Sequence, residues 1–247
     1  MTTISTAFPA ELARREYITR FDIHQRIQHF FLMLSFVLLV LTGMPLKFAD
    51  GAISAWWIGV LGGVEPTRSI HHVAAWTMIG VCGYHAIYLL YGIFIKKKSV
   101  ASMLPTRQDF VLFGQEIAWF VGLRKEKPRY DRYNWREKFD YYAMFWGIPV
   151  MALTGLVLMF PVLVTKFLPG WVVPVALIAH SDESMLALTW IVIVHIYFNH
   201  FAPGVFPLNP SIFTGKLSRE RYMHDHPEEY DRIAETQTAP APKEDKS

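Results

Sequence analysis

Residues 71–95 read HHVAAWTMIGVCGYHAIYLLYGIFI, a stretch of 25 residues without Lys, Arg, Asp or Glu. A helix of about 20 apolar residues is long enough to cross the hydrocarbon layer of a bilayer. The whole chain of 247 residues is 52% hydrophobic and 18% charged, whereas soluble domains have about a quarter of their residues charged. This stretch therefore predicts a membrane-spanning helix, and the composition predicts that others accompany it.

Three further apolar stretches meet or approach the length of a span. They run from about Ile27 to Leu46, from Tyr141 to Thr165, and from near His180 to a point before Pro203. The fourth must end there because proline ends a helix. The sequence therefore predicts an all-α integral membrane protein, a four-helix transmembrane bundle.

Shorter apolar segments lie in the connections. Ala52–Val64 and Phe167–Ile178 are too short to span a bilayer and lie between spans. In Phe110–Leu123, the apolar residues recur at every third or fourth position. That spacing predicts a short interfacial helix between the second and third spans.

Lys and Arg are distributed unevenly around the spans. There are 4 before the first span, 11 between the second and third, and 6 after the fourth, against 2 and 1 in the other two connections. Basic residues favour the cytoplasmic side, so both termini and the long middle connection are predicted to be cytoplasmic. This gives a cytoplasmic N-terminal segment (1–26), a transmembrane domain (27–203) and a cytoplasmic tail (204–247). The net charge of +3 is explained by this topology and requires no nucleic-acid partner.

Histidines recur in and beside the spans, where ionisable groups are costly and mark functional sites. His71 and His85 are 14 residues apart, and His180 and His195 are 15 apart. In helices these separations are about 21 Å and about 22 Å and return each side chain to nearly the same face. Two antiparallel helices would thus bring two histidine pairs to two matching depths. Such pairs are typical of bis-histidine haem ligation inside a bundle.

One choice of ligand stays open. His29 opens the first span and competes with His85 for the haem nearer the cytoplasm. Cys82 is the single cysteine, so no paired-cysteine attachment sequence exists and the predicted haems are non-covalent, b-type groups. Histidines in charged segments, by contrast, are expected to be solvated: His24, His224 and His226.

Around these histidines the chain resembles a known family. The segments RIQHFF (26–31), RSIHHVAA (68–75) and HIY (195–197) resemble the cytochrome b subunits of membrane-bound formate dehydrogenases and nickel-iron hydrogenases. The segments HIYFNH (195–200) and HPEEY (226–230) resemble a branch of that family associated with multihaem c-type cytochromes.

The resemblance implies two haems. In the family, the histidines that open the second and fourth spans hold the outer haem, and here these are His71 and His180. The first-span and later fourth-span histidines hold the inner haem, and here these are His29 and His195. His85 then either replaces His29 or contacts a haem propionate or quinone, and a third haem on His29 is a further alternative.

The resemblance also implies a quinone site just before the third span. Asn134 and Lys138 match the family's Asn and Lys there, and Glu137 and Asp140 are suited to relaying protons. A quinone needs hydrogen-bond donors for its carbonyls and a proton route. An ordinary charged loop at the interface is the alternative.

These observations together predict a dihaem cytochrome b subunit of the bacterial inner membrane and its respiratory chain. It would carry electrons between membrane quinone and a periplasmic iron–sulfur subunit or multihaem c-type cytochrome, within a hetero-oligomeric oxidoreductase. One alternative is a stand-alone transmembrane b-type electron carrier. The other is a haem-free transporter or anchor, which is disfavoured because the chain has no clear internal repeat.

Overall fold

The computed structural model describes residues 16–202 and 205–238 and divides the chain into two compact units. Residues 23–98 and 140–212 form one, which we call the bundle unit. The other, the polar unit, comprises the described residues of 1–22, 99–139 and 213–247. Each unit is described by itself.

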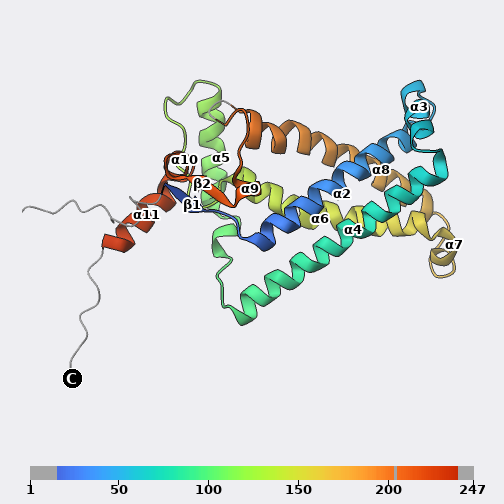
Figure 1. Cartoon of the computed structure of the whole chain (residues 1–247), viewed down its shortest axis with the longest axis horizontal. Coiled ribbons are helices and arrows are strands. Elements are labelled where there is room, and N and C mark those ends of the chain that lie inside the picture. The colour runs from blue at the N-terminus through green and yellow to red at the C-terminus, as the bar shows by residue number, and fades with distance from the viewer. Residues whose placement is uncertain (1–15, 203–204, 239–247) are drawn as a thin grey trace, which may run out of the picture. The chain divides into compact units, whose positions relative to one another are not determined.

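Four long helices dominate the structure, and they are labelled in Figure 1. They are α2 (Ile23–Lys47), α4 (Val64–Leu90) with its π-helical continuation η1 (Tyr91–Ile95), α6 (Trp135–Met159), and α8 (Val172–Trp190) with its π-helical continuation η3 (Ile191–Phe201). Each is long and apolar enough to cross a membrane. The predicted four-helix transmembrane fold is confirmed, while the predicted orientation of the termini stays a prediction.

The helix ends differ from those predicted. The second span begins at Val64 rather than His71, and the fourth at Val172 rather than His180. The third runs from Trp135 to Met159 rather than from Tyr141 to Thr165. A stretch without charges marks the part of a helix that suits hydrocarbon, and a helix can begin one or two polar turns earlier. Short helices fill the connections: α3 (Ala52–Val60) and α7 (Pro161–Val164).

Small side chains lie where the helices of the bundle unit touch. Ser35, Thr42, Thr67 and Ala74 are buried, each at most 2% exposed. Small residues allow helix backbones to approach closely in a membrane. Large apolar side chains instead lie on the outside of the long helices, as at Leu153, where lipid would cover them.

The polar unit contains the charged segments between and after the spans. Its elements include α5 (Arg107–Phe120), which lies at the predicted interfacial helix, the 3₁₀ turn η2 (Ala101–Met103), and α9 (Ser211–Thr214), α10 (Arg219–Asp225) and α11 (Pro227–Thr238). Strands β1 (Tyr17–Thr19) and β2 (Lys216–Ser218) pair antiparallel, with Ile18 opposite Leu217. The all-α prediction did not include this two-stranded ribbon, because three-residue strands carry too little periodicity to be read from sequence.

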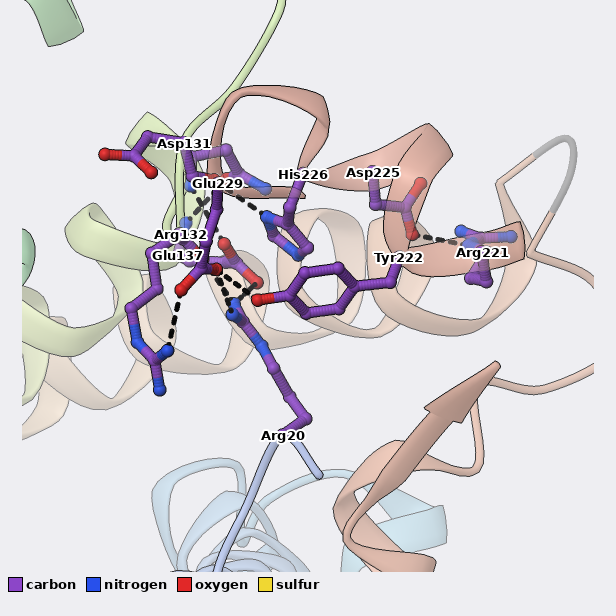
Figure 2. A network of polar contacts seen from close by, with 10 residues as sticks. Arg20, Asp131, Arg132, Glu137, Arg221, Tyr222, Asp225, His226 and Glu229 are labelled. Atoms are coloured by element: carbon purple, nitrogen blue, oxygen red, sulfur yellow. Dashed lines mark hydrogen bonds and ion pairs between the residues drawn. The ribbon is translucent and has the colours of Figure 1, made fainter. Parts of the chain in front are cut away.

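A polar network holds the unit together, and Figure 2 shows it. The buried Arg20 guanidinium donates to the Arg132 carbonyl oxygen at 2.6 Å and pairs with Glu137 at 3.3 Å. Glu229, also buried, accepts hydrogen bonds from Arg132 and from the Tyr222 hydroxyl. The segments before the first span, before the third and after the fourth are thus joined by ion pairs of the buried Arg20 and Glu229.

His226 lies inside this network and corrects one expectation. Its Nδ1–H donates to the carbonyl oxygen of Asp131 at 2.9 Å, and its residue exposure is only 4%. The predicted solvated position was wrong for His226, because a charged sequence neighbourhood does not reveal that its partners fold back over it. The last twelve residues, 236–247 (TQTAPAPKEDKS), have a composition that predicts a disordered tail. α11 extends to Thr238, and the residues after it lie outside the described range.

Candidate haem site

Two pairs of histidine rings face each other in the bundle unit. His71 on α4 and His180 on α8 have ring centres 6.4 Å apart, with 64° between their planes. His29 on α2 and His195 on η3 have ring centres 6.2 Å apart, with 26° between their planes. These are the pairs that the resemblance implied, and α8 with η3 supplies one member of each.

Both separations fit a metal held between two imidazoles. A metal–imidazole bond is about 2 Å long and the ring centre lies about 1 Å beyond the nitrogen, so two such rings on opposite sides of one iron have centres about 6 Å apart. The measured distances of 6.4 Å and 6.2 Å match this value. The donor set, two histidines from facing helices, is the one used for b-type haem in helix bundles.

Hydrogen bonds fix the tautomers of His71 and His180. The Thr42 hydroxyl donates its single proton to the Leu38 carbonyl oxygen at 2.7 Å, so it accepts from Nδ1 of His71 at 2.8 Å. Nδ1 of His71 therefore carries the proton, and Nε2 keeps the lone pair that a metal needs. Thr42 is 2% exposed, so water does not compete for this contact.

The same arrangement recurs on the other side of this pair. The Thr154 hydroxyl on α6 donates to the Val150 carbonyl oxygen at 2.6 Å and accepts from Nδ1 of His180 at 3.0 Å. Both histidines thus have the same protonation pattern, with Nδ1 protonated and the lone pair of Nε2 available.

Each threonine is followed by a glycine that lies against the same histidine ring. A Cβ added at Gly43 would lie 3.1 Å from Cε1 of His71, and a Cβ added at Gly155 would lie 3.2 Å from Cε1 of His180. Those distances are tighter than ordinary contacts. The absence of a side chain at both positions therefore lets each ring pack directly on the neighbouring helix.

His195 has a partner of a different kind. Its Nδ1 lies 2.9 Å from Oδ2 of Asp140, and the Trp190 indole N–H donates to Oδ1 of the same carboxylate at 2.6 Å. An ionised carboxylate only accepts hydrogen bonds, so Nδ1 of His195 carries the proton here as well. A carboxylate behind a metal-binding histidine is a common way to orient the ring.

Comparison with known proteins agrees with this geometry. Residues 111–205 match the family model described as prokaryotic cytochrome b561. The formate dehydrogenase cytochrome b556(fdo) subunits of three Escherichia coli strains (K12, O6:H1 CFT073 and O157:H7) are each 21% identical to this chain over 228 residues. Those alignments cover 91% of this chain and 97% of each relative.

The resemblance to the cytochrome b subunit family is confirmed. The four apolar helices and this family identify a multi-pass protein of the bacterial inner membrane. They also identify an electron-transport subunit of an oxidoreductase, for which the family implies b-type haem. The nearer branch, with multihaem c-type cytochromes, stays a prediction.

His85 lies among polar and aromatic side chains of the bundle unit. Its Nδ1 is 2.8 Å from Oε1 of Gln28, and its Nε2 is 3.2 Å from the Tyr141 hydroxyl. Its ring also stacks near Tyr88, with ring centres 6.4 Å apart. Both ring nitrogens of His85 therefore have protein partners, whereas the ring of His29 faces His195.

The three predicted quinone-site residues all make internal contacts. Asn134 accepts a hydrogen bond from the Glu137 backbone N–H at 2.9 Å and thereby caps α6. Lys138 is buried and pairs with Asp109 at 2.8 Å. Asp140 contacts His195, as described above. Asn134 and Lys138 belong to the polar unit and Asp140 to the bundle unit, so their grouping in one site stays a prediction.

The histidines and Asp140 could be predicted from the sequence, but the other residues that position them could not. Thr42, Thr154 and Trp190 were not singled out, because each becomes informative only when two helices are in contact. One signal was available. Leu-Thr-Gly occurs at 41–43 and again at 153–155, in the first and third spans.

Proposed function

We propose that this cytochrome b holds two b-type haems and passes electrons between membrane quinone and a redox partner in a hetero-oligomeric oxidoreductase. His71 and His180 would hold one haem, and His29 and His195 the other. The observation that carries the proposal is the equal spacing of the two ring pairs, 6.4 Å and 6.2 Å.

The chain's residues would bind and orient the haems, and bound haem iron would supply a one-electron carrier at each level. Thr42 and Thr154 hold the protons on Nδ1 of their histidines, and Asp140 does so for His195. His180 and His195 are 15 residues apart in the sequence, which is roughly 20 Å along a helix. The two levels would therefore carry electrons across the greater part of the bilayer.

The quinone and the partner belong to the same proposal. Quinone would bind near the start of α6, where Asn134, Lys138 and Asp140 offer donors and a proton route. The named relatives are subunits of a formate dehydrogenase. By analogy the partner would be a periplasmic iron–sulfur subunit or a multihaem c-type cytochrome.

The test is a haem count on the purified protein. A reduced-minus-oxidised spectrum and a pyridine haemochrome assay should show b-type haem at two per chain. His29→Ala should lose one haem, as should His71→Ala, while His85→Ala should keep both. His72→Ala is the matched control beside His71 and should also keep both. A folded preparation without haem would refute the proposal, and loss of haem in His85→Ala but not in His29→Ala would refute the ligand assignment.

The quinone part needs its own test. In liposomes that contain a reduced quinone, the haems of the wild-type protein should become reduced within the time of mixing. Lys138→Ala and Asn134→Ala should slow that reduction about 10-fold or more while the haem count is unchanged, since each removes a donor that positions a reactant. Equal rates in wild type and both variants would remove these residues from the quinone site.

A further inference from the structure

The two histidine pairs differ in the charge of their hydrogen-bond partners. His71 and His180 donate from Nδ1 to neutral threonine hydroxyls, at 2.8 Å and 3.0 Å. His195 donates to a carboxylate oxygen of Asp140, at 2.9 Å. The geometries are similar, so the main difference between the partners is one negative charge.

Asp140 is fixed in this position from two directions. The Trp190 indole N–H donates to Oδ1 at 2.6 Å while His195 occupies Oδ2. Both donors come from α8 and its continuation η3, and both side chains of the His195–Asp140 pair are less than a third exposed. A carboxylate within a membrane span is costly unless it is paired, and here both oxygens have partners.

A carboxylate acceptor changes the electronic character of a ligand histidine. It draws the Nδ1 proton toward itself and makes Nε2 a stronger electron donor to a metal. A stronger donor, with a nearby negative charge, favours ferric over ferrous iron and so lowers the reduction potential. A threonine hydroxyl has neither effect to the same degree.

We infer that Asp140 tunes the His29/His195 haem to the lower of the two reduction potentials, while Thr42 and Thr154 leave the His71/His180 haem at the higher one. The inference rests on the proposed function, because it requires both haems. Electron transfer from the His29/His195 level to the His71/His180 level is then downhill. In this reading Asp140 is a positioning residue that acts on iron through His195.

A charge near the other pair acts in the same direction. Lys47 at the end of α2 contacts Ser181, the neighbour of His180, and lies 4.0 Å from Asp182. Its side chain is 27% exposed. A cation beside the His71/His180 level would raise the potential there, although the exposed Asp182 carboxylate offsets part of that effect.

Glu183 supplies a control within the same bundle. A Cβ added at Gly147 would lie 2.9 Å from Oε1 of Glu183, so this carboxylate faces α6. Among the described residues it has no hydrogen bond to any of the four ligand histidines. It therefore tests whether a carboxylate acts simply by being in the bundle.

The experiment is a potentiometric titration of the purified full-length protein, followed by haem absorption. His29→Ala and His71→Ala, each retaining one haem, assign the two potentials. Asp140→Asn keeps an acceptor for His195 but removes the charge. It should increase the equilibrium constant for reduction of the lower-potential haem at least tenfold, which raises its reduction potential by about 59 mV for one electron. The higher potential should not change. Asp140→Glu should restore the wild-type value, and Glu183→Gln should shift the lower potential less than Asp140→Asn does.

Trp190→Phe gives a second measurement that does not depend on the survival of Asp140→Asn. It removes one donor from the carboxylate, which should then accept more strongly from His195 and lower that potential further. The inference would be overturned if the protein binds two haems but the lower reduction potential does not change in Asp140→Asn. It would also be overturned if that potential rises in Trp190→Phe. Either result would leave the proposed function intact. A wild-type protein without two haems would overturn the proposed function itself.

Discussion

At the scale of single residues, the hydroxyl protons of Thr42 and Thr154 decide which nitrogen of each neighbouring histidine is available to iron. Intramembrane histidines are conspicuous in a sequence because ionisable groups are rare there, so His29, His71 and His180 could be predicted. Their partners could not, because threonine is common in membrane helices and its role depends on which helix lies opposite. Only contact between α2 and α4 shows that Thr42 reaches His71.

Removing both hydroxyls should loosen the His71/His180 haem. In a Thr42→Val, Thr154→Val double variant, nothing holds the Nδ1 protons or the ring orientations. Loss of outer partners of this kind typically costs about 10–100-fold in metal affinity. The rate of haem transfer to an excess of apomyoglobin measures this, and the haem left behind should be that of the His29/His195 pair. The Thr→Ser double variant keeps both hydroxyls and should transfer haem at the wild-type rate; equal rates for Val and Ser variants would contradict the argument.

His226 should make the stability of the polar unit depend on pH. Burial, together with the nearby Arg20 cation, lowers the pKa of His226 below its ordinary value. Between that lowered pKa and about 6.5, the unfolded chain binds a proton that the folded unit does not. The free energy of unfolding should therefore fall as the pH drops below about 6.5, and rise again toward neutral pH.

His226→Asn tests this expectation, since an Asn amide can still donate toward the Asp131 carbonyl but does not titrate. Hydrogen exchange of β1, β2 and α10 measures the opening of the unit between about pH 5 and pH 7. The wild-type protection should decrease toward the acid end, and the variant's protection should change less. An equally steep profile in the variant would assign the dependence to other groups.

At the scale of elements, hydropathy located the four long helices but not where they begin. The charge-free stretch at 71–95 corresponds to the apolar part of α4 together with η1, yet the helix begins at Val64 and includes Glu65 and Arg68. Helix propensity and capping set these ends, whereas hydropathy reports only the part that suits lipid. The β1–β2 ribbon could not be predicted from the sequence for another reason. Its strands are separated by almost the entire chain and are held by side chains such as Arg20 and Glu229.

The ribbon should fail when the buried charge at Glu229 is removed. In Glu229→Gln, the buried Arg20, whose side chain is 4% exposed, loses a counter-charge 3.8 Å away. Breaking a buried ion pair costs about 3–5 kcal/mol when the remaining charge is left without a partner. Arg20 keeps Glu137 at 3.3 Å, so the expected loss is smaller, about 1–3 kcal/mol. Hydrogen exchange of β1 and β2 should report a loss of that order. Asp231→Asn, which removes an exposed partner of Arg129, is the matched control and should cost about 0–1 kcal/mol.

At the scale of the whole molecule, the distribution of basic residues predicts how the protein is inserted. The segments before the first span, between the second and third, and after the fourth contain 21 of the 24 Lys and Arg residues. In the structure most of the described residues of these segments lie in the polar unit, including Arg20, Arg132 and Arg232. That three distant segments share one unit agrees with a common side of the membrane, because strand pairing and ion pairs between them require it.

Reporter fusions test this orientation directly. Alkaline phosphatase is active only outside the cytoplasm. Green fluorescent protein fluoresces when it folds in the cytoplasm, but not when it is exported in unfolded form. A fusion after Ser247 should fluoresce and lack phosphatase activity, while a fusion after Gly63, between α3 and α4, should show phosphatase activity and no fluorescence. The reason is that the connection from Lys47 to Arg68 contains only 2 basic residues, so it is the segment that crosses. The reverse pattern at both positions would show that the topology is opposite to the predicted one. The His71/His180 pair would then lie at the cytoplasmic side, away from any periplasmic partner.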